Sequence, residues 1–355
     1  MSVFRGGRSH AFILALIGSA ALATEPERIP DLPQAITNNA VAQLQLDGQR
    51  VLVSLMGLGS GKTWRDTTAR VYRYRAGDEG WQRLPNVPGP AGRLAGTAVG
   101  VDDRVLVFGG YTVGAEGAEV SVDLVHGLDP VSGDYEELAP MPVPVDDAVS
   151  LVYRERYVYL VSGWHDSGNV NLVQVYDTEE DRWFQATPFP GAPVFGHAGG
   201  ISGRRMIICD GVRIQTPVSG SRFFEPESAC YLGEVDAEDP VRIRWRRLPH
   251  HGGPATYRMA ARGSDRLGMV VFAGGSDNPY NYNGIGYDGA PSKPSDRVFA
   301  YHLEDDAWRE LGKLPEAAMD HRGLLEADDA FLILGGMRRS QAVSSGVLYF
   351  SIRRP

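Results

Sequence analysis

Six short hydrophobic runs recur along the chain, and each of them ends in one or two glycines. Valine, leucine, isoleucine and aromatic residues dominate these runs, as is typical of buried β-strands. The runs occupy residues 51–57, 105–110, 158–163, 206–211, 269–275 and 331–336. Recurrence at a spacing of roughly fifty residues is a signature of repeat architectures, in which each repeat is one supersecondary unit.

Two further elements follow most of the runs. The first is a strand of alternating character, found at residues 69–74, 172–177 and 296–301. The second is a strand that begins with an aromatic residue and ends at or near a proline, found at residues 81–85, 135–140, 183–188, 245–249 and 308–315. Because proline cannot donate to a β-ladder, this last strand suits the outer edge of a sheet.

The sixth repeat has no such closing strand, because the chain ends at Arg354 and Pro355. Residues 27–33 lie alone near the other end of the sequence and are similar to the closing strands, although they lack the aromatic residue. We infer that this N-terminal strand completes the last repeat. The pattern predicts an all-β fold in which six four-stranded sheets are arranged radially and bury one another, as a single domain over residues 24–355.

The glycine doublet, the tyrosine downstream of it and the tryptophan about seven residues later resemble kelch repeats. The resemblance covers nearly all of the chain after residue 23 and implies a six-bladed kelch β-propeller whose last blade is closed by the N-terminal strand. Kelch propellers serve as oxidases, sugar mutarotases and protein-binding modules. The resemblance is therefore more specific for the fold than for the function.

The first residues predict export. Arg5 and Arg8 precede an apolar run at residues 11–17, and residues 21–23 form an A-x-A site. This is the layout of a secretory signal peptide over residues 1–23, so we expect a periplasmic or secreted protein. No later stretch approaches ~18 consecutive apolar residues, so we expect no membrane anchor after cleavage.

Charge and cysteine content narrow the chemistry further. The formal net charge is -9, so the chain lacks the basic excess that binding to a phosphate backbone demands, and we expect no nucleic-acid partner. The two cysteines, Cys209 and Cys230, could form a disulfide after export or could remain reduced in the core. Neither lies in a C-x-x-C motif, and we expect no metal and no cofactor.

A long insertion in the fifth repeat, residues 272–289, is rich in Asn, Tyr and Gly. It resembles the corresponding insertion of bacterial N-acetylneuraminate (sialic acid) mutarotases, which are exported six-bladed kelch propellers. The resemblance implies amide and phenol groups that bind sugar hydroxyls. The residues that would supply them are Asn278, Asn281, Tyr282, Asn283 and Tyr287. The alternative is a solvated loop that is ordered by asparagine turns.

The chain also departs from that family. Val212 stands where the mutarotases have a glutamate in the fourth repeat, with Arg213 and Arg222 as candidates for the family's arginine. Asp210, Glu225 and Glu227 are the candidates for the acid, although none has the family spacing. Galactose oxidase-type propellers are a more distant resemblance, because neither cysteine lies in a motif that matches their copper site.

The loops that enter the innermost strands should converge at one mouth of the central channel, and every repeat places polar residues there. These residues are Asn38, Asn39, Arg93, Asp146, Asp147, His197, Tyr257, Arg258, Asp320, His321 and Arg322. We predict that His321, Asp147 and Asp320 exchange protons. Arg93, His197, Tyr257, Arg258, Arg322 and Arg213 would bind the ligand. The alternative is that short polar loops begin strands in any such fold.

These features lead to two functional hypotheses. The first is an exported propeller that binds a carbohydrate or sugar acid at the channel mouth, with a mutarotase- or epimerase-like activity. On this hypothesis, replacing Arg258 by Ala should weaken binding and leave the fold intact. The second is a non-enzymatic propeller that binds a protein partner, and a large exposed apolar patch would favour it.

Overall fold

β-Strands make up almost all of the regular structure. The computed structural model describes residues 1–2, 28–90, 92–166, 168–215, 222–327 and 329–352. Among these residues the helices are two single turns, η1 (Trp64–Asp66) and η2 (Arg339–Gln341), and no helix is long and apolar enough to cross a membrane. The predicted signal peptide lies almost wholly outside the described residues.

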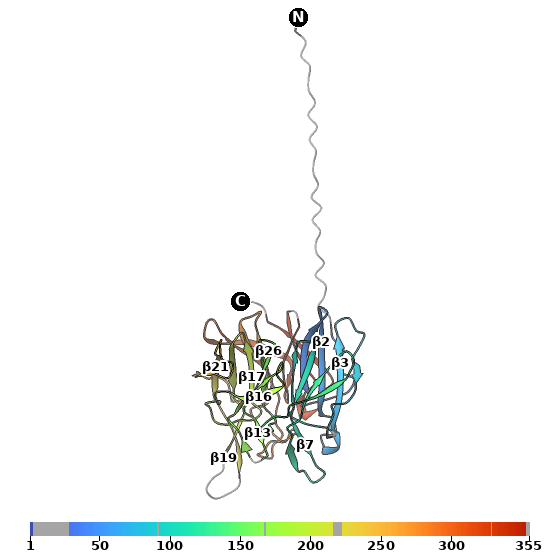
Figure 1. The fold of residues 1–355 in the computed structure, drawn as a ribbon, viewed down its shortest axis with the longest axis vertical. Coiled ribbons are helices and arrows are strands. Elements are labelled where there is room, and N and C mark those ends of the chain that lie inside the picture. Colours follow the sequence, from blue (N-terminus) through green and yellow to red (C-terminus); the bar gives the residue numbers. More distant parts are fainter. Residues whose placement is uncertain (3–27, 91, 167, 216–221, 328, 353–355) are drawn as a thin grey trace.

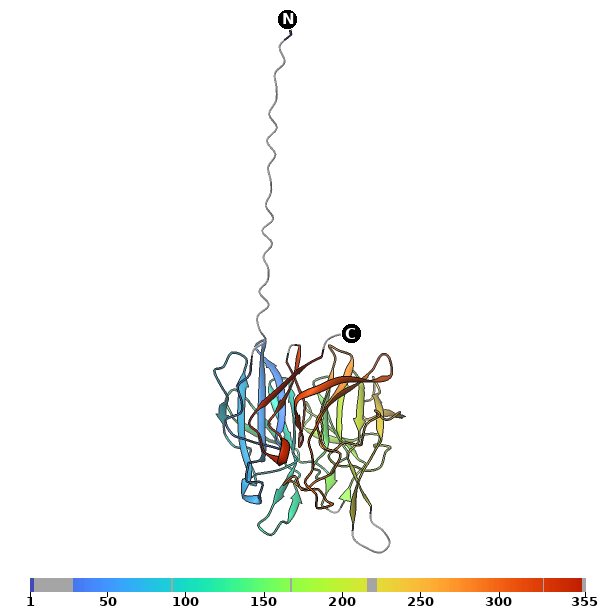
Figure 2. The same cartoon turned by 180° about the vertical axis from the view of Figure 1, so that it is seen from behind.

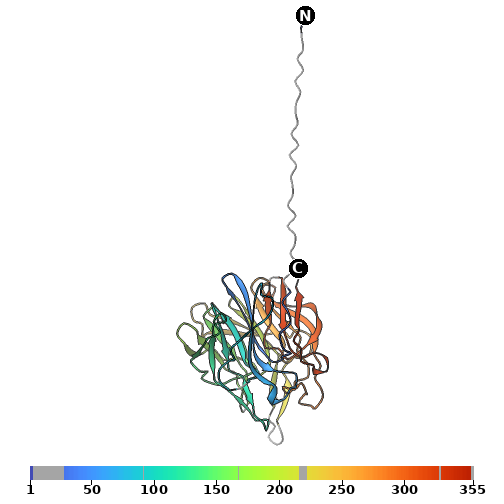
Figure 3. The ribbon, with the colours of Figure 1, turned by 90° about the vertical axis from the view of Figure 1, so that its right-hand side faces the viewer.

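Six antiparallel sheets follow one another along the chain and surround a common axis, as Figures 1, 2 and 3 show from three sides. The first blade holds β1 (Ala40–Leu46), β2 (Gln49–Leu58), β3 (Thr67–Arg75) and β4 (Gln82–Leu84). The second holds β5 (Thr97–Val101), β6 (Arg104–Phe108), β9 (Val125–Leu128) and β10 (Tyr135–Leu138). The third holds β11 (Val149–Tyr153), β12 (Tyr157–Val161), β15 (Val173–Asp177) and β16 (Arg182–Gln185).

The second half of the chain repeats this pattern. The fourth blade holds β17 (Ala198–Ser202), β18 (Arg205–Cys209), β21 (Cys230–Val235) and β22 (Ile243–Leu248). The fifth holds β23 (Ala260–Ser264), β24 (Met269–Ala273), β25 (Ser295–His302) and β26 (Ala307–Ala318). The sixth holds β27 (Leu325–Ala327), β28 (Ala330–Leu334) and β29 (Val347–Ser351). All six glycine-ended runs of the sequence fall on the second strand of a blade, so the predicted propeller is confirmed.

The second strands read as continuous hydrophobic runs because each blade is packed on both faces by its neighbours. In β6, for example, Val105, Leu106, Val107 and Phe108 are all buried, with no more than 1% of each residue exposed. Side chains that alternate across this sheet contribute to two different clusters: Val105 and Val107 pack toward blade 1, and Leu106 and Phe108 pack toward blade 3. The core is therefore a set of layers between blades.

The N-terminal segment closes the sixth blade. Ile29 and Leu32 are buried against β27, β28 and β29, and the Leu32 amide donates to the carbonyl of Ser345 at 2.9 Å. The described part of this segment, residues 28–33, is irregular chain outside any strand. Pro30 and Pro33 explain this difference from the predicted strand, since neither has an N–H group to donate.

Aromatic residues of the outer strands tie each blade to the one before it. Trp183 donates its indole N–H to the carbonyl of Ala139 at 2.8 Å, and Trp308 donates to that of Pro249 at 2.7 Å. Trp81 of the first blade makes the same kind of bond to Pro30 at 2.7 Å. Pro30 therefore takes the place that the outer strand of a preceding blade holds elsewhere in the ring.

Three hairpins extend from the ring beyond its second strands. They are β7 (Tyr111–Val113) with β8 (Glu119–Ser121), β13 (Trp164–His165) with β14 (Gly168–Asn169), and β19 (Val212–Gln215) with β20 (Phe223–Pro226). Figure 1 shows them at the lower end of the molecule, opposite the end where the N-terminal segment leaves the ring. We call this lower end the loop end. The loops that enter the innermost strands lie at the same end, because each of them forms a β-bridge to the residue that begins a hairpin or insertion.

Candidate functional site

One residue in each loop that enters an innermost strand has a left-handed backbone. These residues are Asn38, Ala95, Asp147, Gly196, Arg258 and Asp320, with φ between 50° and 69°. Five of the six are not glycine, and the left-handed region is uncommon for residues such as arginine and alanine. Such strain persists only where the surrounding structure fixes the backbone.

Hydrogen bonds between neighbouring blades hold these positions. The amide of Asp147 donates to the carbonyl of Ala95, that of Gly196 to Asp147, and that of Arg258 to Gly196, at 2.7–3.0 Å. The Asn38 amide donates to the Asp320 carbonyl at 3.1 Å, which joins the first blade to the last. The Ala95 amide donates to the side-chain oxygen of Asn38, and the His321 amide donates to the carbonyl of Arg258 at 3.2 Å, so that the bonds close a ring around the axis.

Four charged side chains form a buried ion-pair layer across this ring. The Arg258 guanidinium donates from Nε and Nη2 to the two oxygens of Asp147, at 3.0 and 2.6 Å, and from Nη1 to Asp320 at 2.9 Å. Arg322 also contacts Asp147, and Thr37 and Asn38 donate to Asp320. The four side chains are at most 4% exposed. The predicted convergence of Arg258, Arg322, Asp147 and Asp320 is therefore present in the structure.

This layer has a structural consequence for Arg258. The sugar-binding hypothesis predicts that Arg258→Ala leaves the fold intact, but Arg258 is only 2% exposed and its guanidinium is bonded on three nitrogens. Its removal would leave Asp147 and Asp320 buried with less compensation, which is strongly destabilising. The expectation that Arg258 can be deleted without cost to the fold does not fit this geometry. The same bonds also leave Arg258 little capacity to hold a ligand carboxylate.

A pocket of about 240 Å³ opens on the loop-end side of this layer. Its lining residues are Tyr111, Glu119, Asp146, Asp147, Trp164, Phe195, Phe224, Arg258, Asn281, Tyr282 and Tyr287. We call it the loop pocket. Six of these residues are aromatic, and we call them the aromatic wall: Tyr111, Trp164, Phe195, Phe224, Tyr282 and Tyr287. Phe224 stacks on Tyr287 with ring centroids 3.9 Å apart, and the ring centroid of Trp164 lies 5.5 Å from that of Phe195. The lining also holds three carboxyl groups and one guanidinium.

Neighbouring carboxyl groups in this pocket differ in acidity. Burial raises the pKa of Asp146 well above its usual value, and the negative charge of Asp147 raises it further. Burial would also raise the pKa of Asp147, but the guanidinium groups of Arg258 and Arg322 outweigh it and lower that pKa. Burial raises the pKa of Glu119 as well. Titratable groups whose environments separate their pKa values in this way are suited to the two roles of acid and base.

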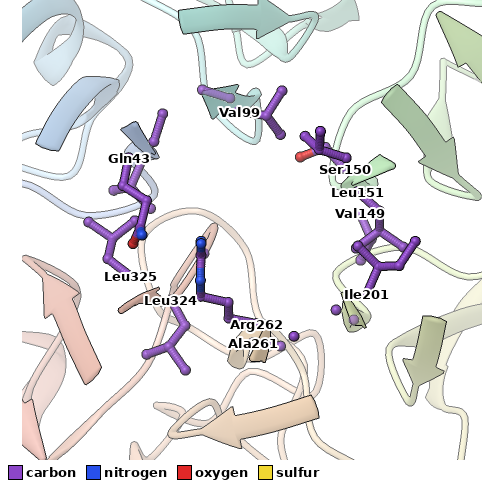
Figure 4. A pocket seen from close by; sticks show the side chains of 18 of the residues that line it. Gln43, Val99, Val149, Ser150, Leu151, Ile201, Ala261, Arg262, Leu324 and Leu325 are labelled. Atoms are coloured by element: carbon purple, nitrogen blue, oxygen red, sulfur yellow. The ribbon is translucent and has the colours of Figure 1, made fainter. Parts of the chain in front are cut away.

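The central channel forms a second, larger cavity of about 540 Å³ on the other side of the ion-pair layer. Figure 4 shows side chains of the innermost strands arranged around it. His197, His321 and Arg322 line this channel cavity and not the loop pocket. Burial lowers the pKa of His197 to about 4 and that of His321 to about 3, so both rings are neutral at pH 7. The two histidines are therefore separated from the loop pocket in which Asp146 lies.

The residues of the fifth-blade insertion fall into two groups: some line the loop pocket and others form hydrogen bonds within the insertion. Asn281, Tyr282 and Tyr287 line the loop pocket. By contrast, the Asn283 side chain accepts from the amide of Ile285, and Asn278 donates to Asp288. Asn278 and Asn283 thus order the loop through asparagine turns, whereas Asn281, Tyr282 and Tyr287 face the pocket.

Several predicted ligand-binding residues do not face the loop pocket. Arg93 donates to the carbonyl of Gly109 at 3.1 Å and lines neither cavity. Arg213, in the β19–β20 hairpin, pairs with Glu225 at 2.8 Å, so it does not replace the arginine of the mutarotase family at a sugar. Tyr257 is buried beneath the pocket, with its ring 5.5 Å from that of Phe195.

The sequence pattern did not point to Tyr111, Glu119, Trp164 or Phe224, which come from the hairpins of blades 2, 3 and 4. Tyr111 and Trp164 directly follow the terminal glycine of their repeats. Each forms a β-bridge, to Leu94 and Asp146 respectively. The position after each glycine therefore faces the same mouth as the loop that enters the innermost strand. A bulky aromatic residue at this position is the sequence signal that could have indicated a pocket-lining side chain.

A cluster in the fourth blade has the composition of a metal site. The ligand atoms of Asp210, Cys230, His250 and His251 lie within 4.8 Å of one another. Cys230, however, forms a disulfide with Cys209, and Arg297 donates to Nδ1 of His251 at 2.7 Å. Nε2 of His251 must then carry its proton, which it donates to Asp210 at 2.9 Å. Because a ligating histidine normally donates from its other nitrogen, these contacts do not suit a metal.

Comparisons with known proteins agree with this architecture. No family model matches the chain. Human Kelch domain-containing protein 3 is 26% identical over 252 residues, which cover 64% of this chain and 60% of that protein. Human Kelch-like protein 15 is 22% identical over 266 residues, covering 70% of this chain and 40% of that protein. The chain thus spans well under two thirds of the length of these relatives.

A solved structure gives a more complete match. The chain described as "Structure of YjhT" superposes with a TM-score of 0.71 at 17% sequence identity, covering 92% of this chain and 97% of that one. At this identity the likeness concerns the fold alone. The kelch relatives, the structural neighbour and the six sheets together identify the fold as a six-bladed kelch β-propeller.

Proposed function

We propose that this protein is an exported propeller that binds an uncharged sugar in the loop pocket. The observation that carries the proposal is that aromatic rings and carboxyl groups line one cavity together. Aromatic faces cover the apolar C–H surface of a sugar ring, and carboxyl and amide groups bind its hydroxyls. Export rests on the sequence of residues 1–23 alone.

The charges of the loop pocket favour a neutral sugar over a sugar acid. Glu119, Asp146 and Asp147 face one guanidinium, that of Arg258, whose donors are already bonded to Asp147 and Asp320. A ligand carboxylate would therefore lose its hydration against carboxyl groups without a free cation to pair with, which is costly in a partly buried site. Of the two ligand classes that the sequence suggests, a carbohydrate or a sugar acid, we therefore propose the uncharged carbohydrate.

The binding proposal is tested by a thermal-shift screen over neutral hexoses, N-acetylhexosamines and sugar acids, followed by calorimetric titration of each ligand found. The matched variants are Phe224→Ala and Phe223→Ala. Phe224 stacks on Tyr287 in the pocket, whereas Phe223 is 51% exposed and does not line it. Phe224→Ala should weaken binding about tenfold, which corresponds to about 1.4 kcal/mol. Equal affinities of the two variants, or a screen in which no neutral sugar binds, would contradict the proposal.

Mutarotation is a second candidate, favoured by the two carboxyl groups of raised pKa in the pocket. In this reaction Asp146 would protonate the ring oxygen as the C1–O5 bond breaks, and the Glu119 carboxylate would take the proton of the C1 hydroxyl. Closure of the ring on either face of C1 returns both protons. Saturation-transfer NMR of the bound sugar should show accelerated anomer exchange in the parent protein and none in Asp146→Asn. The same exchange rate in both would exclude this role of Asp146.

The rival hypothesis is a protein-binding propeller, which would need a larger exposed apolar surface than the loop end presents. Among the described residues of the loop end, the large apolar side chains that are at least half exposed are Val120 and Phe223. They lie on separate hairpins, β7–β8 and β19–β20. Isolated apolar side chains are normal on protein surfaces, whereas interaction sites usually form contiguous patches of several hundred Å². The loop pocket therefore supports small-molecule binding better.

A further inference from the structure

Ser121 connects the two carboxyl groups of the loop pocket that mutarotation would use as acid and base. It is the last residue of β8, and its hydroxyl donates to Oδ2 of Asp146 at 2.6 Å. Glu119, the other carboxyl group, begins the same short strand. Ser121 is 7% exposed, so the contact with Asp146 lies inside the molecule. One residue thus belongs to the strand that carries Glu119 and contacts the side chain of Asp146.

The register of the β7–β8 hairpin explains why Ser121 points toward the pocket. Ser121 pairs with Tyr111, and Val120 pairs with Thr112. Side chains alternate between the two faces of a strand, and directly paired residues share a face. Tyr111 and Glu119 both line the loop pocket, so Ser121 lies on the face of the hairpin that is turned to it. Val120 and Thr112 lie on the opposite face, where Val120 is half exposed.

The main chain on both sides of this contact is held by one neighbouring hairpin, β13–β14. The amide of Ser121 donates to Oδ1 of Asp166, which lies in the turn of that hairpin, at 2.9 Å. The amide and the carbonyl of Asp146 both bond to Trp164 of β13, at 2.9 and 2.8 Å. The segments that carry Glu119 and Asp146 are therefore fixed to a common support, and the Ser121 hydroxyl joins them directly.

The Ser121 hydroxyl also determines which oxygen of Asp146 carries a proton. Among the described residues this hydroxyl has one acceptor, Oδ2 of Asp146, and no second residue donates to the Asp146 side chain. A proton on Oδ2 would turn the serine hydrogen away and leave a buried O–H without an acceptor, which is costly. The proton of the neutral acid therefore belongs on Oδ1. Because Asp146 lines the loop pocket, Oδ1 is the oxygen left to meet a ligand.

We propose that Ser121 is a positioning residue of the loop pocket, which holds Asp146 with Oδ1 toward the sugar and holds Glu119 beside it. This role rests on the proposed mutarotation, in which Asp146 gives its proton to the ring oxygen and Glu119 takes that of the C1 hydroxyl. Both oxygens are attached to C1, so the acid and the base must keep a fixed separation for the two transfers. Ser121 does not line the pocket and acts through the two carboxyl groups.

Carbon-13 NMR titration of the Asp146 carboxyl group in the protein without sugar tests the contact, with Asp146→Asn to assign the signal. Burial raises the pKa of Asp146, and the hydrogen bond from Ser121 offsets part of this increase. The pKa of Asp146 should therefore rise further in Ser121→Ala and return to that of the parent in Ser121→Thr, which keeps a hydroxyl. Thr112→Ala is the matched control, because it removes a hydroxyl from the opposite face of the same hairpin, and it should leave this pKa unchanged. The same pKa in Ser121→Ala and in the parent would overturn the proposal.

The pH profile of anomer exchange tests the consequence for the reaction. In Ser121→Ala the maximal exchange rate should fall about tenfold, because the proton of Asp146 is no longer held on Oδ1. The alkaline limit of the profile should move to higher pH, because exchange requires the protonated form of Asp146. The affinity for the sugar should stay within about twofold of the parent, which also shows that the variant is folded.

The two measurements separate the role of Ser121 from the proposed function. A lower exchange rate with an unmoved pH profile in Ser121→Ala, or a Ser121→Thr variant that behaves like Ser121→Ala, would contradict the positioning role. A parent protein without anomer exchange would contradict mutarotation, and the titration of Asp146 would still decide whether Ser121 holds this carboxyl group.

Discussion

The loop pocket presents carboxyl groups and aromatic rings, whereas the channel cavity, reached a few residues further along the same six segments, is lined by the innermost strands together with His197, His321 and Arg322. The two cavities meet at the ion-pair layer of Arg258, Asp147, Asp320 and Arg322. The difference follows from the backbone. Strand residues around the axis must pack against one another, while each loop residue is held by the main chain of a neighbouring blade, which leaves its side chain free to carry chemistry.

The largest expected effect comes from breaking the ion-pair layer that separates the cavities. Arg258→Ala should lower the free energy of unfolding by about 3–5 kcal/mol, because it leaves buried carboxylates without their partner. Arg213→Ala is the control, since it removes an arginine from a partly exposed pair with Glu225 and should cost at most about 1 kcal/mol. Denaturant unfolding measures both. Equal losses in the two variants would mean that the layer does not stabilise the fold.

The next effect concerns acid sensitivity at the channel side of the layer. Burial lowers the pKa of His197 from 6.5 to about 4, so the unfolded chain binds more protons than the folded chain between these two values. Stability should therefore be full above pH 6.5 and fall as the pH is lowered toward 4, by about 3 kcal/mol for this group.

His197→Gln should remove the loss of stability that His197 causes at low pH, because glutamine does not titrate. Its amide can still donate to the carbonyl of Val161, which the histidine ring contacts at 2.9 Å. Unfolding free energies at pH 7 and pH 4.5 make the comparison. His302→Gln, at the end of β25, is the control and should retain the acid loss of the parent. A His197→Gln profile as steep as that of the parent would show that His197 is not the source.

A smaller effect tests the aromatic wall of the loop pocket. Trp164→Ala should weaken the sugar found by the screen about tenfold, because it removes a stacking face of that wall. The neighbouring His165 lies on the same hairpin but does not line the pocket, so His165→Ala should change the affinity by less than twofold. Calorimetric titration distinguishes the two outcomes. A larger loss of affinity in His165→Ala than in Trp164→Ala would mean that the sugar does not bind against this wall.

The last expected effect has the opposite sign. Because burial raises the pKa of Asp146, the folded state binds a proton that the unfolded state releases, and stability falls as the pH rises above 3.8 and through the raised value. Asp146→Asn removes this titration. The variant should gain stability relative to the parent as the pH rises from 4 to 9 in thermal unfolding. A parallel pH dependence in both proteins would show that Asp146 is ionised throughout.

The fold could be predicted from the sequence because its determinants are local and repeated. Six glycine-ended runs mark the second strands, and the outer aromatic strands mark the blade edges. The sequence pattern predicted a regular N-terminal strand that the structure lacks, since Pro30 and Pro33 have no N–H donors for a ladder. The position of Asp147 and Arg258 at one mouth was predictable for the same reason, because equivalent loops of a closed ring converge.

The direction in which a loop side chain points was not predictable. Arg93 lies two residues before a left-handed position and turns away from both cavities, whereas Arg258 occupies such a position and reaches the axis. Nor does spacing show which donors are already used: Arg213 is paired with Glu225, and Arg258 with Asp147 and Asp320. The partners lie at very different separations along the chain, from 12 positions for Arg213 and Glu225 to 111 positions for Arg258 and Asp147.

Titration with glucose and glucuronate is the most direct test of the claim that the loop pocket selects an uncharged sugar. The two ligands have the same ring, and they differ in a hydroxymethyl group against a carboxylate. If the three carboxyl groups of the pocket and the occupied donors of Arg258 decide selectivity, glucose should bind more tightly at pH 7, and the difference should shrink at high salt. Tighter binding of glucuronate would contradict the account, because it would require a free cation in the pocket.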